Sequence, residues 1–276
     1  DYTLYMVARK AYMIVPFNHG IKKYTGLSKT KLYKETFNTL KSEWEQQKAL
    51  SRTTYYQEIT AKTKFFTDYT NPEYAGADDI IARKSGMDDI TRFIKITDKG
   101  EEKTVYTPGS SNSNALTVSN GKIYWSEYEP DPRWSNRSYS VIKEYDSNTG
   151  KRKKLSRKSR YFVPDVSPDG TKLAVVDVDK HDRYSLKILD VEDGEVLQSI
   201  STPENIFFMT PRWSDDNRNV AGTLLKKEGK GLALIDSETA EINLMIPFAY
   251  LESRGPKGRT TCRSTPFTYR VSQGGK

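Results

Sequence analysis

Hydrophobic and polar residues alternate with a period of two over much of this chain, most clearly between Tyr161 and Ser199. Extended runs in this stretch are separated by a Ser-Pro-Asp-Gly turn, a polar loop and an Asp-Gly turn. Period-2 alternation interrupted by such residues is typical of antiparallel strands joined by hairpins. The stretch therefore predicts one four-stranded antiparallel unit, with strands at Tyr161–Val166, Lys172–Val178, Tyr184–Asp190 and Val196–Ser199.

The turns of this unit recur along the chain. Ser167, which opens the first turn, has counterparts at Ser119 and Ser214, 48 and 47 residues away. The turn before the last strand recurs at Thr97–Gly100, Asp146–Gly150, Val191–Gly194 and Asp236–Thr239. A four-stranded repeat of this length indicates an all-β fold, a β-propeller with one repeat per blade, and we expect four recognisable four-stranded blades. A β-sandwich whose hairpins are similar by accident is the alternative.

The predicted blades occupy residues 51–250. We expect the first at residues 65–108, the second at 109–160 and the fourth at 205–247, with Phe65–Tyr69 as the first strand of the first blade. Residues Tyr55–Thr60 could add a lone strand, of the kind that completes the last blade of a closed propeller.

The segments Ser167–Val176 (SPDGTKLAVV) and Tyr184–Glu195 (YSLKILDVEDGE) resemble the WD40-like repeat of TolB-type propellers. The resemblance extends over roughly residues 64–248 and is sharpest in the third repeat. It implies a β-propeller from the bacterial cell envelope, in the periplasm or at the cell surface. TolB-type propellers usually have more than four blades, so we expect the visible set to be incomplete. The motif specifies a fold and leaves the function open.

Residues 1–50 follow a helical period instead. Gly26 offers a break in the chain, and Ser28 or Thr30 offers an N-cap for a helix that follows it. One face of that helix carries residues at i, i+4, i+7 and i+11, namely Tyr33, Phe37, Leu40 and Trp44. Such a stripe is more typical of a packing face than of a ligand site, and it requires a partner surface. We expect a short N-terminal helical segment here.

The segment from Ala11 to Gln47 resembles the last helices of a gluzincin-type zinc metallopeptidase domain. In some bacterial envelope proteins such a domain precedes a TolB-like propeller. The zinc motif of that family, His-Glu-x-x-His, is absent from this sequence, whose two histidines are His19 and His181. If the resemblance holds, residues 1–50 are a remnant of an upstream domain that carries the catalytic helices.

The net charge of +8 does not predict nucleic-acid binding, because the excess lies at one end. No acidic residue follows Glu252, and residues 253–276 hold six of the eight surplus positive charges. The remainder of the chain has no basic stripe and no nucleic-acid-binding motif. We expect residues 251–276 to be an irregular basic tail. No run of apolar residues approaches the length of a membrane-spanning helix.

Candidate chemistry is sparse. The sequence contains no Gly-x-Ser-x-Gly elbow, phosphate-binding loop or dinucleotide fingerprint, and we expect neither catalytic residues nor a cofactor. The innermost strands of a propeller line its central channel, which makes Asp165, Arg212 and Trp213 candidate ligand-binding residues at the channel mouth. The alternative role for these three residues is packing and hydrogen bonding between blades.

A second candidate is a cation site at Asp177, Asp179 and Asp182, close to His181. Carboxylate oxygens are the ligands that hard cations prefer, but the run lacks the glycine and the downstream glutamate of an EF-hand loop. The alternative is a solvated hairpin loop.

Two functional hypotheses follow. The first is a non-catalytic binding or scaffold module of a bacterial envelope protein, with a protein, peptide or glycan as its ligand. The second is an accessory propeller of a zinc metallopeptidase. In an incomplete propeller the open flank of the fourth blade, with Phe207 and Leu234, would also mediate association.

Overall fold

The computed structural model describes residues 2–10, 16–50, 58–60, 63–76, 79–111, 115–134 and 136–249. The chain divides into two compact units, residues 1–58 and residues 59–276. The first unit is helical and the second is all-β. Among the described residues, no helix is both long and apolar enough to cross a membrane.

The helical unit contains α1 (Tyr2–Arg9), α2 (Pro16–Thr25) and α3 (Lys29–Leu50). Gly26 ends α2 with a positive φ of 78°, and its N–H donates to the carbonyl of Lys22. Ser28 then caps α3, because its hydroxyl accepts a hydrogen bond from the N–H of Lys31 at 3.3 Å. The predicted break and N-cap therefore lie where the sequence placed them.

The predicted stripe on α3 is present but uncovered within its own unit. Tyr33 and Phe37 lie ring to ring with centroids 4.4 Å apart. Tyr33, Phe37 and Trp44 are exposed, and α3 has no buried residue. The partner that this face was expected to need is not supplied by α1 or α2.

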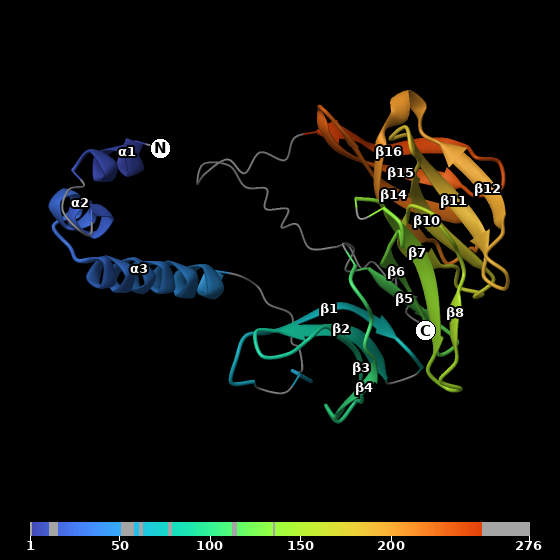
Figure 1. Cartoon of the computed structure of the whole chain (residues 1–276), viewed down its shortest axis with the longest axis horizontal. Helices are drawn as coiled ribbons and strands as arrows, with labels where there is room; N and C mark the ends of the chain where they lie inside the picture. The colour runs from blue at the N-terminus through green and yellow to red at the C-terminus, as the bar shows by residue number, and fades with distance from the viewer. Residues whose placement is uncertain are drawn as a thin grey trace. The chain divides into compact units, whose positions relative to one another are not determined.

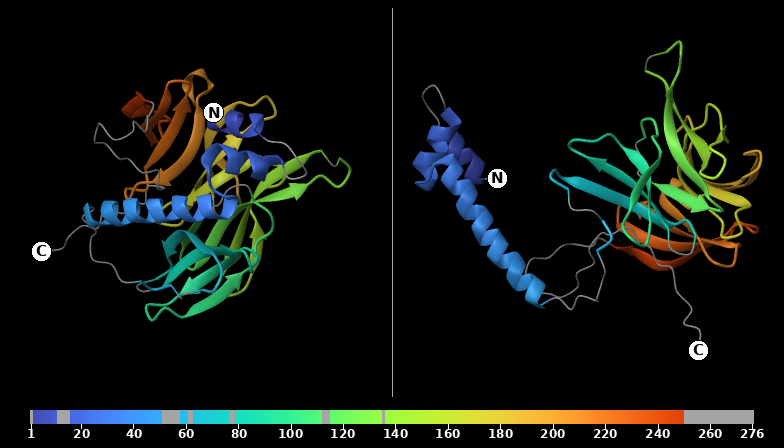
Figure 2. Two further views of the ribbon diagram at one scale, coloured as in Figure 1. Left: turned by 90° about the vertical axis from the view of Figure 1, so that its left-hand side faces the viewer. Right: turned by 90° about the horizontal axis from the view of Figure 1, so that it is seen from below.

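The second unit is a β-propeller of four four-stranded antiparallel sheets, which follow one another in chain order (Figures 1 and 2). We name the sheets blades 1 to 4, and in each blade the first strand lies at one edge and the last strand at the other.

Blade 1 consists of β1 (Thr67–Tyr74), β2 (Ile80–Gly86), β3 (Arg92–Ile96) and β4 (Glu102–Tyr106). Blade 2 consists of β5 (Leu116–Ser119), β6 (Lys122–Pro130), β7 (Ser138–Asp146) and β8 (Arg152–Lys154). Blade 3 consists of β9 (Tyr161–Val166), β10 (Lys172–Val178), β11 (Tyr184–Asp190) and β12 (Val196–Ser201). Blade 4 consists of β13 (Phe207–Trp213), β14 (Asn219–Lys226), β15 (Gly229–Asp236) and β16 (Ile242–Ala249). The predicted fold class is confirmed.

The recurring Ser-Pro-Asp-Gly turn is held by its own side chains. The Ser167 hydroxyl donates to the Asp169 carboxylate at 2.6 Å and accepts from the N–H of Lys172 at 2.9 Å. Gly170 has φ 77°, the left-handed conformation that the turn requires. The turns also contact one another between blades, because the N–H of Asp169 donates to the side-chain oxygen of Asn217 at 2.8 Å. Hydrogen bonds within the turn and between the turns of neighbouring blades thus hold this part of the repeat in place.

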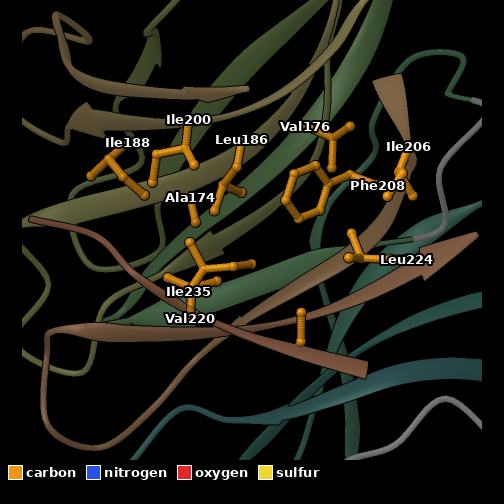
Figure 3. Close-up of a cluster of buried hydrophobic side chains, with 11 residues drawn as sticks. Ala174, Val176, Leu186, Ile188, Ile200, Ile206, Phe208, Val220, Leu224 and Ile235 are labelled. Atoms are coloured by element: carbon orange, nitrogen blue, oxygen red, sulfur yellow. The ribbon is translucent and has the colours of Figure 1, made fainter. Parts of the chain in front are cut away.

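Apolar clusters join each blade to the next. One cluster links Ile81 and Phe93 of blade 1 to Leu116, Ile123 and Trp125 of blade 2. A second links blades 2 and 3. The third links blades 3 and 4, where the side chains of the two sheets face one another (Figure 3). No cluster of the described residues links blade 4 to blade 1, and the expectation of an incomplete set of blades stays a prediction.

Four expectations need correction or fall outside the described residues. The first strand was predicted at Phe65–Tyr69, whereas β1 runs from Thr67 to Tyr74 because a bulge between Thr70 and Glu73 lets it continue past Pro72. Phe207 packs edge-on against Tyr184 of blade 3, with centroids 4.9 Å apart, and does not lie on the outer flank. Most of the predicted strand at 55–60 and the whole of the predicted tail at 251–276 lie outside the described residues.

Two glycines at equivalent turn positions allow the close packing between blades to be tested by substitution. Gly150 and Gly194 both have positive φ, at 70° and 80°, so an alanine at either site is strained. A Cβ on Gly194 would lie 1.9 Å from the carbonyl oxygen of Leu155, whereas a Cβ on Gly150 would meet nothing within 4 Å. We therefore expect Gly194→Ala to lower the free energy of unfolding by roughly 2 kcal/mol more than Gly150→Ala. Equal urea midpoints for the two variants would contradict this contact.

The carboxylates of the turns predict acid sensitivity. Hydrogen bonds from the N–H of Thr239, together with Arg218 and the N–H of Glu238, lower the pKa of Asp236 to about 2. A lowered carboxyl pKa stabilises the fold above the ordinary Asp pKa, and this stabilisation is lost as the pH falls toward 2. Asp236→Asn should be less stable than the parent at pH 7, with a difference that shrinks as the pH approaches 2. Urea denaturation at both pH values measures this. Glu241→Gln removes the same charge from the same turn as a control, and a difference that stays constant with pH would contradict the prediction.

Candidate binding site at the central channel

The candidate site is built on the first strands of the blades, which lie side by side in the order β1, β5, β9 and β13. Three of these strands carry a proline directly before a charged residue, in the pairs Pro72-Glu73, Pro164-Asp165 and Pro211-Arg212. Each of the three strands also has a β-bulge just before the charged residue. A bulge bends the strand and redirects the side chains that follow it, and proline is tolerated there because the ladder is already interrupted.

The three charged side chains meet. Nη1 of Arg212 donates to Oδ1 of Asp165 at 2.6 Å and to Oε1 of Glu73 at 3.1 Å. The guanidinium therefore connects the first strands of blades 1, 3 and 4. Trp213 completes the group, because its backbone N–H donates to Oδ2 of Asp165 at 2.7 Å and its indole N–H donates to the carbonyl of Asp165 at 3.0 Å.

The contact between Asp165 and Trp213 has a counterpart one blade earlier. Thr117 pairs with Tyr124 in blade 2 as Asp165 pairs with Ala174 in blade 3. The hydroxyl of Thr117 accepts a hydrogen bond from the N–H of Val166 at 3.4 Å, as the carboxylate of Asp165 accepts from the N–H of Trp213. A side-chain oxygen of one blade thus receives a backbone N–H of the next blade at two successive interfaces.

Burial and charge act in opposite directions in this group. Asp165 is buried, and burial raises the pKa of its carboxyl, although Arg212 and the N–H of Trp213 both favour the ionised form. Burial alone would lower the pKa of the Arg212 guanidinium, but the carboxylates of Asp165 and Glu73 raise it overall. About a third of the Arg212 side chain remains exposed, at 33%. The site therefore combines a buried, fully bonded carboxylate with a guanidinium that still reaches solvent.

The predicted cation site is not assembled. Asp177 pairs with Lys187 at 2.8 Å, Asp179 with Arg183 at 2.6 Å and Asp182 with Arg160 at 3.6 Å. Backbone N–H groups of Arg183 and His181 also bond Asp179, and with the Arg183 side chain they lower its pKa to about 2. Each carboxylate thus faces its own cation, because Asp177 lies on β10 while the other two lie in the loop. No group of three or more His, Cys, Asp or Glu side chains in the described parts of the chain is placed to hold a metal ion.

A second concavity lies between the outer strands of blades 1 and 2. It has a volume of about 300 Å³, and its lining includes Tyr106, Trp125, Glu129, Lys143, Arg152 and Lys154. Lys154 pairs with Glu129 at 2.7 Å, and the Arg152 guanidinium lies over the Tyr106 ring, 5.7 Å from its centroid. The concavity lies between two blades, whereas the Arg212 group joins three, so we take the Arg212 group as the candidate site.

The structure brings together Asp165, Arg212 and Trp213, the residues that the repeat pattern placed at the channel mouth. Sequence reasoning missed Glu73 and Thr117. Glu73 has a visible signal, the proline before it, which is shared with Asp165 and Arg212. Thr117 has none, because its strand carries no proline, and its role follows only from the strand register.

Comparisons with known proteins give solved structures that are similar to parts of this chain. Neither the models of known protein families nor the curated proteins match this sequence. TolB from Acinetobacter baumannii is similar in structure at 17% identity, with a TM-score of 0.47 over 67% of this chain and 44% of that one. The β-propeller domain of the trilobed protease from Pyrococcus furiosus is similar at 16% identity, with a TM-score of 0.43 over 68% of this chain and 59% of that one. A chain of the nidogen/laminin complex is similar at 16% identity, with a TM-score of 0.45 over 63% of this chain and 60% of that one. This chain therefore spans about half of the length of these proteins.

The role of Asp165 at the blade interface can be tested by removing its charge. Asp165→Asn leaves the Arg212 guanidinium without its closest carboxylate in a largely buried position, so the free energy of unfolding should fall by roughly 3 kcal/mol. Asp182→Asn, at an exposed ion pair, is the matched control and should change stability by less than about 1 kcal/mol. Urea denaturation of both variants makes the comparison, and equal midpoints would show that the Asp165 contacts do not hold the blades together.

Proposed function

We propose that this chain is a non-catalytic, TolB-like β-propeller module that binds a carboxylate-bearing segment of a protein, peptide or glycan at the mouth of its central channel. The observation that carries the proposal is the position of Arg212. We also propose that the protein is located in the bacterial cell envelope, because its repeat resembles that of TolB-type propellers.

Arg212 retains N–H donors for an anionic group, although Asp165 and Glu73 already pair with its charge. Among the described residues, both hydrogen bonds of its guanidinium leave from Nη1, toward Asp165 and Glu73. A guanidinium has five N–H donors in a fixed plane and can hold a carboxylate through two parallel bonds. Because two carboxylates already fix its orientation, little side-chain entropy would be lost when a ligand binds.

The same contacts favour binding over hydrolysis. Both oxygens of Asp165 accept hydrogen bonds, one from Arg212 and the other from the backbone of Trp213. A general base must be free to take a proton from the attacking group. A carboxylate held in this way has a positioning role.

The test uses short peptides with a free C-terminal carboxylate, the same peptides as C-terminal amides, and oligogalacturonate as an acidic glycan. We expect the carboxylate forms to bind, with affinity that falls as salt is added, and the amides to bind at least about 10-fold more weakly. Arg212→Lys keeps the charge but loses the planar pair of donors, and it should weaken binding by about 10-fold. Isothermal titration calorimetry measures both effects.

Arg218→Lys is the matched control, because Arg218 is a paired arginine in a turn of the same blade, away from the channel. Its affinity for the peptides should equal that of the parent. Equal binding of acids and amides, or equal losses in the two variants, would contradict the proposal. Cleavage of the peptides that a chelator abolishes would replace it with a hydrolytic function.

A further inference from the structure

The concavity between the outer strands of blades 1 and 2 is formed on one face of the blade-2 sheet. Lys143 pairs with Lys154 across β7 and β8. Tyr145 and Arg152 form another pair on the same face, two residues away along each strand. Trp125 of β6 pairs with Lys143 and packs against apolar side chains of blade 1. This face therefore turns toward blade 1 and carries aromatic rings and cations side by side.

The aromatic wall of the concavity is held in place by its own contacts. Tyr106, at the end of β4 in blade 1, is half-buried and stacks on Tyr145 with ring centroids 4.8 Å apart. The Trp125 ring lies 5.0 Å from the Tyr106 ring. The indole N–H of Trp125 donates to the buried carboxylate of Glu127 at 2.9 Å. The wall is therefore formed before any ligand arrives, as is usual for small-molecule sites.

The positive charges on this face are not equally paired. Lys143 pairs with Glu127 at 2.5 Å and lies 3.6 Å from Glu129. Lys154 pairs with Glu129 at 2.7 Å. Arg152 is exposed, and no carboxylate in the part of the chain that the structure describes forms an ion pair with it. Three cations thus share two carboxylates, and the charge of Arg152 is the one left over.

The two other charged residues of the lining belong to the opposite face of the sheet. Lys153 lies between Arg152 and Lys154 along β8, so its side chain points the other way and donates to the carbonyl of Glu192 in blade 3. Glu144 pairs with Lys153 in register and forms an ion pair with Lys122 at 3.3 Å. Neither residue neutralises Arg152.

Arg152 keeps its hydrogen-bond donors while its position is fixed. Its guanidinium lies over the Tyr106 ring, 5.7 Å from the centroid, and this cation–π contact uses none of its N–H groups. A guanidinium can hold a phosphate, sulfate or carboxylate through two parallel hydrogen bonds. An anionic group is therefore the part of a ligand that Arg152 would recognise.

We propose that this concavity is a second binding site, which takes a sugar residue that carries one anionic substituent. The sugar ring lies against Tyr106 and its anionic group binds Arg152. Glu129 and Lys154 place an acceptor beside a donor, and sugar hydroxyls can both donate and accept. The volume of about 300 Å³ is at the lower end for ligand pockets and suits a single ring. The site shares no residue with the channel group, so the proposal does not rest on the function proposed there.

The test is isothermal titration calorimetry of the full chain with glucose 6-phosphate, glucuronate, glucose and inorganic phosphate. We expect at least one of the two sugar anions to bind, and the difference between them shows whether the site prefers a phosphate or a carboxylate. Glucose and inorganic phosphate should each bind at least about 10-fold more weakly than the preferred sugar anion, because each lacks one part of the ligand. Inorganic phosphate that binds as tightly as glucose 6-phosphate would indicate an adventitious ion only and overturn the proposal. Failure of both sugar anions to bind overturns it as well.

Arg152→Gln should weaken binding of the preferred sugar anion by about 10-fold and leave the urea midpoint unchanged, since Arg152 is exposed. Arg157→Gln is the matched control, because Arg157 is another exposed arginine directly after β8 that does not line the concavity. It should bind like the parent, and equal losses in the two variants would reduce the effect to general attraction by charge and contradict the site. A loss in Arg212→Lys that Arg152→Gln does not show would assign the sugar anion to the channel, which also contradicts it. Peptide binding at the channel is judged by Arg212→Lys alone, so either proposal can fail without the other.

Discussion

Face-to-face packing of apolar side chains between consecutive blades is the interaction on which this propeller depends. A four-stranded sheet with two apolar faces is not stable alone, and burial of a single Leu or Ile side chain contributes only about 1.5–3 kcal/mol. The cluster between blades 3 and 4 gathers residues such as Leu186, Ile188 and Phe208 from both sheets. Blades 2 and 3 bury both of their faces in this way, whereas blade 4 buries one. Blade 4 therefore differs from blades 2 and 3 because one of its apolar faces stays exposed.

The inner ends of the blades are held by polar contacts instead. Bulges in the first strands leave backbone N–H groups that must be satisfied across the interface. Thr117 and Asp165 fulfil this role at successive interfaces. The charge of Asp165 in turn requires Arg212, since a buried carboxylate is costly unless it is paired and hydrogen-bonded. A structural requirement thus fixes an arginine at the channel with part of its guanidinium in solvent.

Blade 4 therefore combines two surfaces of different chemistry. Its inner edge carries the Arg212 guanidinium, which Asp165 and Glu73 hold in place, beside Trp213. Its open face presents Leu232 and Ile246, two exposed apolar side chains that pair across β15 and β16. The two surfaces lie on one sheet, and under our proposal binding at the first would depend on charge and geometry, whereas a contact at the second would depend on buried area. Salt should distinguish them, because screening weakens charge pairs and leaves apolar burial largely unaffected.

The sequence by itself determined the all-β class, the four blades and most strand positions, because alternation and the turns around Ser167 and Gly170 are local signals. The period of the repeat also placed Asp165 and Arg212 on the first strands of neighbouring blades. The tertiary structure alone decided that Glu73 joins them, that Phe207 turns toward blade 3, and that Asp177 and Asp179 face separate cations. The physical reason is the same in each case. A bulge or a hairpin loop redirects side chains by breaking the period of two, and contacts across blades join residues far apart in the sequence, such as Glu73 and Arg212.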